Sequence, residues 1–213
     1  IEANLITIEP VERVVRETVE GLGGLDILVN NAGLIRRADA VEFSEKDWDD
    51  VMNVNIKSAF FMSQAAGRHF IAQGSGKIIN IASMAALMQA PGMSNYNVAK
   101  AGVVALSESL LVELRQLEIG VHVVCPSFFQ TNLLDSFRGP TPEMKQQVGK
   151  LLEGSPISAS DIAGYIYDEV AKGEFMILPH EQGRMAWAIK QKNPQALYDE
   201  LEHNFPVILL LMF

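Results

Sequence analysis

Short apolar segments alternate along the chain with longer segments in which apolar residues recur at helical spacing. The apolar segments span residues 25–30, 77–82 and 121–125, and each is typical of a β-strand that is covered on both faces. The longer segments predict helices from about residue 44 to 69 and from about 96 to 118. Strands that alternate with helices pair in parallel, because each helix carries the chain back along the sheet. The sequence therefore predicts an α/β fold with helices on both faces and ligands beyond the carboxyl ends of the strands.

The segments at either end extend this pattern. Residues 3–8 are expected to form a short strand or its exit, and Pro10 is expected in the first turn of the next helix. The later predicted elements are a helix capped by Ser160 and ended by Gly173, a strand over residues 174–178, and helices over residues 183–192 and 194–203. Residues 1–213 are predicted to be a single domain, with residues 132–154 as a substrate lid and the tail over 207–213 unassigned.

Composition narrows the partners. The 213 residues are 48% hydrophobic, which is enough for a buried core, and the net charge of −9 comes without a Lys/Arg cluster. That charge argues against nucleic acid and anionic membrane surfaces as partners. The single cysteine, Cys125, excludes an internal disulfide and fits a reducing compartment. With no resemblance to a signal peptide and no apolar run of ~20 residues, we expect a cytoplasmic protein that acts on a small molecule.

Two other kinds of site have weak signals. The four histidines are scattered and there is no His-Glu-x-x-His or Cys-x-x-Cys, so no metal site is expected. The glycine-rich stretches 21–24 and 74–77 come before strands rather than after them, the reverse of a phosphate-binding loop. Both stretches are predicted to be turns.

Tyr96 and Lys100 are four residues apart on a predicted helix, so their side chains should leave the same face. A free tyrosine has a pKa of about 10, and a neighbouring ammonium favours the phenolate and lowers that pKa. A tyrosine tuned in this way can serve as a general acid or base. Ser83, at the end of the preceding strand, could hold a substrate oxygen near the phenol. Taken alone, the Tyr/Lys spacing is also common on solvated helix faces, so the wider pattern must decide.

That wider pattern resembles the short-chain dehydrogenase/reductase family. The matching features are Asn30-Asn31-Ala32-Gly33 after a buried strand, Asn55, Ser83, and Tyr96 followed by Lys100. The resemblance covers about residues 3–180 and implies a Rossmann-type doubly wound parallel sheet with NAD or NADP as cofactor. It implies an enzyme that moves a hydride between nicotinamide and a secondary alcohol or ketone.

The resemblance also implies a role for each matching residue. Tyr96 would be the catalytic acid/base, Lys100 would lower its pKa and hold the nicotinamide ribose, and Ser83 would orient the substrate carbonyl. Asn55 would anchor a water-mediated proton relay. The cofactor-binding residues would be Asn30, Ala32, Gly33, Tyr96, Lys100, Pro126 and Thr131.

Within the family, residues 25–84 are closely similar to 2-deoxy-D-gluconate 3-dehydrogenases, which suggests a sugar acid as substrate. Residues 156–200 resemble a different branch, and Pro126-Ser127 replaces the usual Pro-Gly. The family's Thr-Gly-x-x-x-Gly-x-Gly turn is absent from these residues, so the sheet is expected to lack its first two βα units. We therefore expect an exposed apolar sheet edge and weak binding of NADH or NADPH by this chain alone.

Two alternatives to an oxidoreductase are a non-catalytic relative that kept the scaffold for binding or regulation, and a hydrolase that uses Ser83. The hydrolase has little support because there is no Gly-x-Ser-x-Gly motif. The resemblance further implies a homodimer or homotetramer formed through helices at about 47–72 and 94–118. The apolar residues expected on their outer faces are Phe60, Phe61, Phe70, Val104 and Leu111.

Overall fold

The computed structural model describes residues 1–129, 146, 149–150, 155, 157–199 and 202. Within them, four strands form one parallel sheet in the order β1-β2-β3-β4. The strands are β1 (Ile27–Asn30), β2 (Gly76–Ile81), β3 (Ile119–Val124) and β4 (Met176–Ile177). Central strand residues such as Ile78 and Val121 are paired directly and are buried, as expected for strands covered on both faces. The predicted α/β fold with a parallel sheet is confirmed.

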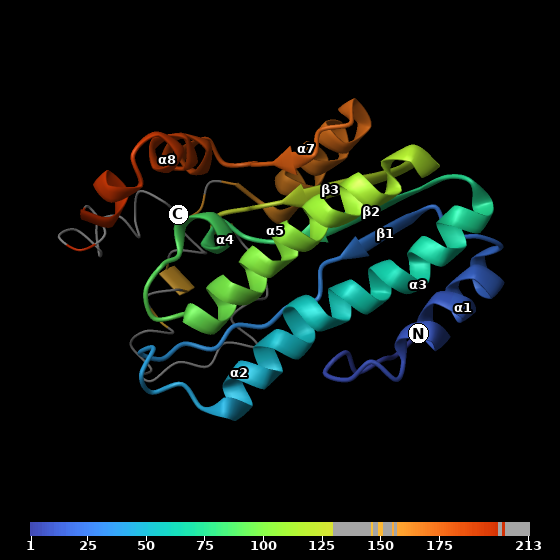
Figure 1. Cartoon of the computed structure of the whole chain (residues 1–213), viewed down its shortest axis with the longest axis horizontal. Helices are drawn as coiled ribbons and strands as arrows, with labels where there is room; N and C mark the ends of the chain where they lie inside the picture. Colours follow the sequence, from blue (N-terminus) through green and yellow to red (C-terminus); the bar gives the residue numbers. More distant parts are fainter. Residues whose placement is uncertain (130–145, 147–148, 151–154, 156, 200–201, 203–213) are drawn as a thin grey trace.

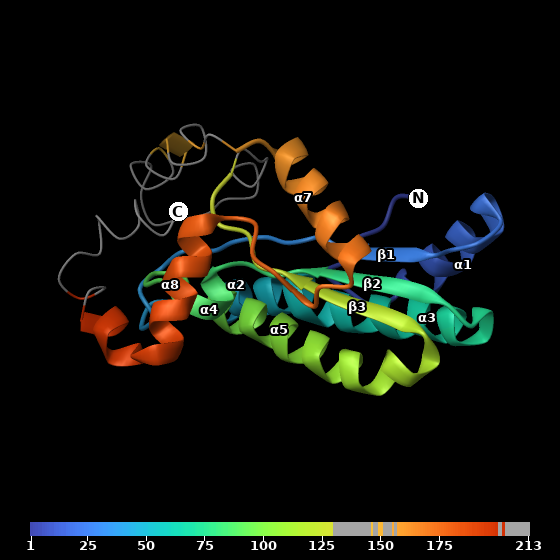
Figure 2. The same cartoon turned by 90° about the horizontal axis from the view of Figure 1, so that it is seen from above.

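Helices lie on both sides of this sheet (Figures 1 and 2). The long helices α3 (Ser58–Gln73) and α5 (Ser94–Leu114) cover one face, and α7 (Ala159–Lys172) covers the other (Figure 2). The remaining helices are α1 (Val11–Leu22), which packs on α3, α2 (Glu45–Met52), α4 (Ala85–Met88) and α8 (Glu181–Lys192). A π-helical turn, η1 (Asn53–Lys57), joins α2 to α3, and a 3-10 turn, η2 (Arg115–Leu117), follows α5. Residues 194–199 are also helical, as predicted.

Local chemistry explains where the helices begin and end. The Ser44 side chain accepts a hydrogen bond from the Asp47 amide at the start of α2, where a helix is predicted from about residue 44. Gly173 ends α7 in the left-handed conformation, at φ 84°, also as predicted. The predicted cap of α7 is wrong by two residues: Ser158, rather than Ser160, accepts from the Asp161 amide. Asp161 completes a capping box by accepting from the Ser158 amide, and this reciprocal pair makes Ser158 the better start.

Residues 3–8 were expected to form a short strand or the exit from one, and the strand is wrong. Residues 5–8 form turns and bends, and none of residues 3–8 is in a strand. The Asn4 side chain accepts a hydrogen bond from the Ile6 amide, which favours a turn over an extended backbone. β1 therefore lies at the edge of the described sheet, and Ile27 and Val29 on it are 51% and 52% exposed. The expected exposed apolar sheet edge is confirmed.

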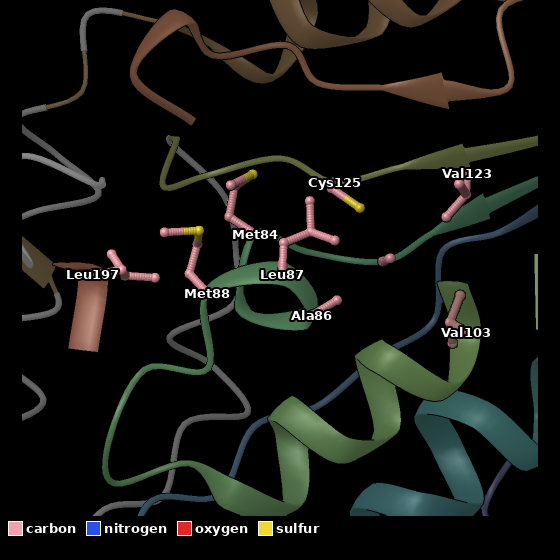
Figure 3. Packing of buried hydrophobic residues seen from close by; sticks show 9 residues of the cluster. Met84, Ala86, Leu87, Met88, Val103, Val123, Cys125 and Leu197 are labelled. Carbon is pink, nitrogen blue, oxygen red and sulfur yellow. The ribbon is translucent and has the colours of Figure 1, made fainter. Parts of the chain in front are cut away.

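The core occupies the spaces between the sheet and the helices. Phe70 of α3 is fully buried against Leu28, Ile78 and Leu114, so its expected place on an outer face is wrong. A second cluster lies beside the carboxyl ends of β2 and β3, where Met84, Leu87 and Met88 gather around α4 (Figure 3). It also contains Ala82, Ala86, Val103, Val123, Cys125 and Leu197. This second cluster fixes the segment that follows β2.

Two predicted features fall on residues that are not described. Thr131 lies outside the described residues, and so does nearly all of the expected lid at 132–154. Both stay predictions, as does the single domain over residues 1–213.

The close packing of Phe70 on β2 gives a test of the fold. A Cβ at Gly76 would lie 2.3–2.7 Å from ring atoms of Phe70, whereas a Cβ at Gly67 in α3 would meet nothing within 4 Å beyond its own helix. Gly76→Ala should lower the free energy of unfolding by about 1–3 kcal/mol, because the buried ring must shift. Gly67→Ala should instead be neutral or stabilising by up to about 1 kcal/mol. Urea unfolding of both variants measures this, and equal effects would contradict the packing described here.

Candidate active site

Tyr96, Lys100 and Ser83 come together at the carboxyl end of β2. Tyr96 and Lys100 lie in the first two turns of α5 and are 8% and 4% exposed. The Lys100 Nζ donates a hydrogen bond of 2.7 Å to the carbonyl of Ile81, the last residue of β2, and lies 5.6 Å from the Tyr96 ring centroid. Ser83 is two residues beyond that strand and hydrogen-bonds to Tyr96. The structure thus brings the three residues together, as the spacing predicts.

The acid–base properties of this group differ from the expectation. Burial raises the pKa of Tyr96 to about 12, and the opposing effects of the Ser83 hydrogen bond and the Arg37 charge are smaller. Burial also lowers the pKa of Lys100 to about 8. Lys100 is not among the groups that shift the pKa of Tyr96, so the expected lowering of this pKa by Lys100 is wrong, and desolvation of the phenolate raises it instead. At neutral pH Tyr96 carries its proton and is ready to donate it.

Asn55 lies in the π-helical turn η1 and is 2% exposed. Its side-chain oxygen accepts from the Leu34 amide at 2.8 Å, and its side-chain nitrogen donates to the Leu34 carbonyl at 2.9 Å. An asparagine in the middle of a helix commonly points to solvent or bonds to a single nearby carbonyl. Asn55 instead pairs with both backbone groups of Leu34. Irregular helical turns of this kind often occur at functional sites. Here the turn aims Asn55 at the loop that follows β1 and fixes that loop in place.

The Asn31-Ala32-Gly33 segment is exposed at the end of β1. A Cβ at Gly33 would lie 3.4 Å from the Asn55 side-chain oxygen and 3.6 Å from the Lys100 Nζ. The absence of a side chain at Gly33 therefore keeps a polar space open directly above Lys100. An ammonium has three donors, and the hydrogen bond to Ile81 uses one of them. Two donors of the Lys100 ammonium are therefore left for a ligand beside Gly33.

Asn30 is placed differently from a residue that touches a cofactor directly. Its side-chain nitrogen donates to the Asn80 side-chain oxygen at 2.8 Å and to the Ser63 hydroxyl at 2.9 Å. Asn80 in turn donates to the Ser107 hydroxyl at 2.9 Å. The network ties β1 and β2 to α3 and α5 beneath the site. Asn80 is a site residue that the sequence analysis misses, although a polar residue inside an apolar strand is a signal for it.

Pro126 and its neighbour close the site on the β3 side. The Pro126 carbonyl accepts a hydrogen bond of 2.9 Å from the Met84 amide, which joins the segments after β2 and β3. The Ser127 amide donates to the His180 Nδ1 at 3.1 Å. His180 is 4% exposed, and burial lowers its pKa, so it is a neutral ring with its proton on Nε2. His180 was missed as a site residue, because nothing in the local pattern links it to a segment 53 residues away.

Two arginines in the loop after β1 were also missed. Arg36 and Arg37 are 7% and 8% exposed, although arginine is rarely buried. Two adjacent arginines in a predicted loop look like ordinary solvated residues. Only the fold shows that this loop packs beside the site, with Ile35 in the same apolar cluster as Tyr96.

With this geometry in place, comparison with known proteins identifies the family. The sequence model for short chain dehydrogenases matches residues 1–141, and the chain belongs to this family. It is 44% identical over 167 residues to 2-dehydro-3-deoxy-D-gluconate 5-dehydrogenase of Escherichia coli (strain K12), a match that covers 78% of this chain and 66% of that protein. The expected similarity to a sugar-acid dehydrogenase is thereby confirmed.

Solved structures agree with the fold. A short-chain dehydrogenase/reductase from Burkholderia phymatum in complex with NAD superposes with a TM-score of 0.85 at 24% identity, over 92% of this chain and 75% of that chain. A gluconate 5-dehydrogenase from Burkholderia cenocepacia J2315 in complex with NADP and tartrate has a TM-score of 0.59 at 34% identity, over 62% of this chain and 51% of that chain. The Rossmann-type arrangement is confirmed.

The extent of these matches is limited. The chain spans 66% or less of the length of the related sugar-acid dehydrogenases from Escherichia coli, Dickeya dadantii and Gluconobacter oxydans. In the part of the chain that the structure describes, no cluster of three or more His, Cys, Asp or Glu side chains could hold a metal ion. No described helix is both long and apolar enough to cross a membrane.

The buried ammonium of Lys100 predicts a pH-dependent gain in stability when it is removed. A pKa that falls from 10.5 to about 8 on folding costs about 3 kcal/mol while the lysine is charged. Lys100→Met removes that cost but leaves the Ile81 carbonyl without its donor, which returns about 1–2 kcal/mol. At pH 7 the variant should therefore be about 1–2 kcal/mol more stable.

The folded pKa lies below the unfolded one, so the wild-type protein gains stability as pH rises from about 8 to 10.5, and the advantage of Lys100→Met should fade over that range. Urea unfolding of both proteins at pH 7 and at about pH 10.5 measures the difference in stability. Lys192→Met, at an exposed position, should show no such trend. A loss of stability in Lys100→Met at pH 7 would contradict the buried charge.

Proposed function

We propose that the protein is an NAD(P)-dependent oxidoreductase that transfers a hydride between nicotinamide and a secondary alcohol or ketone of a sugar acid. The observation that carries the proposal is the set of buried Tyr96, buried Lys100 and half-buried Ser83 at the carboxyl end of the sheet. Ligands of open α/β sheets bind at that edge. The sugar-acid substrate is supported by the relatives named as gluconate or deoxygluconate dehydrogenases.

The nicotinamide, when bound, supplies the carbon that gives or takes the hydride, and the protein handles the accompanying proton. In ketone reduction, the protonated Tyr96 hydroxyl donates its proton to the oxygen of the substrate as the hydride reaches the carbon. In alcohol oxidation, the Tyr96 phenolate takes that proton back. Ser83 holds the same substrate oxygen beside Tyr96, which is supported by their hydrogen bond.

The other proposed roles concern the cofactor. Lys100, with two donors beyond its bond to Ile81, would bind the nicotinamide ribose in the space beside Gly33. Ala32, Pro126 and Thr131 would line the nicotinamide side, and Asn30 would support it from beneath through Asn80. The Asn55 side-chain oxygen and nitrogen are both bonded to Leu34, so the proposed proton relay would run through the Asn55 backbone or a water bound to it.

A non-catalytic binding or regulatory role has less support. The relatives found are named dehydrogenases or reductases, and the acid–base set is intact. Residues 1–213 contain no Thr-Gly-x-x-x-Gly-x-Gly turn for the pyrophosphate. Assays should therefore use the protein together with any residues encoded ahead of Ile1.

Removal of the Tyr96 hydroxyl tests the proposal. Tyr96→Phe keeps the ring and its packing but cannot transfer a proton, so turnover with a sugar acid and NAD or NADP should fall at least about 10²-fold. Thermal unfolding should change little. Tyr167→Phe, at a position 76% exposed on α7, is the matched control and should keep full turnover. If Tyr96→Phe turns over within about twofold of the parent, Tyr96 is not the proton-transfer group.

We also propose that the protein forms a homodimer or homotetramer through α3 and α5. Both helices carry apolar side chains on solvent-facing stripes: Phe60 and Ile71 on α3, and Val98 and Val112 on α5, are 43–77% exposed. Of the side chains expected there, Phe61, Val104 and Leu111 instead pack partly into the core. Exposed apolar stripes on two neighbouring helices are typical of a contact between protein chains.

The association is tested with a charge placed on α5. At a protein concentration of about 10 µM the parent protein should sediment as a dimer or larger, because stable interfaces hold together at this concentration. Val112→Glu should shift it to monomer, because the interface would bury an unpaired carboxylate. Val41→Glu, 88% exposed in the loop before α2, should leave the association unchanged. A monomeric parent at this concentration would rule out the interface.

A further inference from the structure

The backbone after β3 is held by neighbouring segments one residue at a time. The Cys125 amide donates to the last carbonyl of β4 at 2.9 Å, and the Pro126 carbonyl accepts from the Met84 amide at 2.9 Å. Pro126 has no amide hydrogen, so the Ser127 amide is the next donor along the chain. That amide donates to the His180 Nδ1 at 3.1 Å. The His180 ring therefore supplies the third contact that fixes this segment.

The residue that follows Ser127 packs against the acid–base group. Phe128 is 9% exposed and lies in the apolar cluster that also contains Tyr96 and Ile35. A side chain buried to this extent moves with its backbone, because a packed core leaves little free space around it. A shift of the Ser127 backbone would therefore displace Phe128 and change the surroundings of the Tyr96 ring.

The turn that carries His180 is itself fixed. His180 precedes the first residue of α8, and its carbonyl accepts from the Arg184 amide at 3.1 Å. The Arg184 guanidinium donates to the carbonyls of Leu178 and Pro179 at 2.6 and 3.1 Å, which ties α8 to the end of β4. This turn can therefore serve as a fixed point for the Ser127 amide.

The use of the His180 side chain is unusual for its place in the helix. The residue before the first turn of a helix is most often Ser, Thr, Asp or Asn, whose side chain accepts from an amide of that turn. The His180 side chain makes no such bond to α8 and reaches the segment after β3 instead. Its Nε2 is buried and has no hydrogen-bond partner among the described residues, so the ring acts on Ser127 through Nδ1.

We propose that His180 is a positioning residue: its Nδ1 fixes the Ser127 amide and thereby the packing of Phe128 on the acid–base group. The inference rests on the proposed function, since it concerns the geometry of proton transfer by Tyr96. Burial lowers the pKa of His180, so the ring is neutral at pH 7 and its Nδ1 can accept. A misplacement of about 1 Å can cost on the order of 10² in rate, so a contact behind the site matters to turnover.

Two plainer roles for His180 make different predictions. If the ring only fills space, turnover should follow the stability of each variant. If Nε2 instead donates to a ligand, a side chain with a polar group at that place should keep turnover. Asparagine has its side-chain oxygen where Nδ1 lies, whereas the polar end of glutamine lies nearer to Nε2. His180→Asn and His180→Gln therefore separate the three roles.

Hydrogen exchange measures the bond directly. In the protein that includes any residues ahead of Ile1, His180→Gln should raise the exchange rate of the Ser127 amide about 10-fold, because its acceptor is lost. His180→Asn should keep the exchange rate of the parent. The Cys125 amide, which donates to β4, should exchange at the same rate in all three proteins. This readout does not depend on turnover.

Turnover of D-gluconate with NAD or NADP should follow that exchange rate rather than the thermal midpoint. His180→Gln should lower kcat about 10-fold and leave KM within about threefold, because the substrate contacts are unchanged. His180→Asn should keep kcat within about threefold of the parent. His69→Gln, at a ring that bonds to Gln73 of the same helix on the surface, is the matched control and should change neither kcat nor exchange.

Three results would overturn the inference. One is an unchanged kcat in His180→Gln although its Ser127 amide exchanges faster, which would make the bond structural only. Another is an unchanged kcat in His180→Gln together with a loss in His180→Asn, which would assign the role to Nε2. The third is an unchanged exchange rate of the Ser127 amide in both variants.

Failure of the proposed function looks different. A parent protein that exchanges as expected but turns over neither sugar acids nor other secondary alcohols would reject the hydride transfer, and the positioning role would fail with it. A parent protein that turns over D-gluconate while His180→Gln keeps full kcat would reject the positioning role alone.

Discussion

The hydrogen bond from Lys100 to the Ile81 carbonyl is the interaction on which the rest of the site depends. It ties the first turns of α5 to the last residue of β2 and holds an ammonium in a space that is almost closed to solvent. The fold bears the desolvation of that charge, which shows as a pKa lowered to about 8. A charge kept at this cost beside the Tyr96 ring does not serve stability, which makes Lys100 a candidate for the chemistry of the site.

The loops around this bond are held by side-chain amides rather than by apolar packing alone. Asn55 satisfies both backbone groups of Leu34, and Asn30 and Asn80 join the strands to the helices behind them. Each of these amides is paired, and Asn55 and Asn80 are also buried, so they specify one arrangement of the segments that they join. Glycine at position 33 then leaves the space above Lys100 open. The paired amides thus fix the floor of the site, and the position beside Gly33 and Lys100 is left without a side chain.

The ionisable groups of the site are set apart from their ordinary behaviour by burial. Tyr96 is kept protonated, Lys100 is close to losing its proton near neutral pH, and Arg37 stays charged without a carboxylate from the described residues. Groups whose pKa values are pushed apart in one place can divide the roles of proton donor and cation between them. The sequence spacing alone suggested the opposite direction for Tyr96, because a spacing carries no information on how much water reaches a side chain.

The sequence by itself determined the parallel sheet, the turns that end its helices and the meeting of Tyr96, Lys100 and Ser83. These follow from local rules: apolar segments that alternate with helices, glycine at helix ends, and a four-residue helical spacing. The tertiary structure decided the burial of Phe70 and of the two arginines, the engagement of Asn55 by Leu34, and the contact between Ser127 and His180. These depend on segments far apart in the chain that meet only after the sheet is assembled. Desolvation is a property of that assembly, so no stretch of sequence could reveal it.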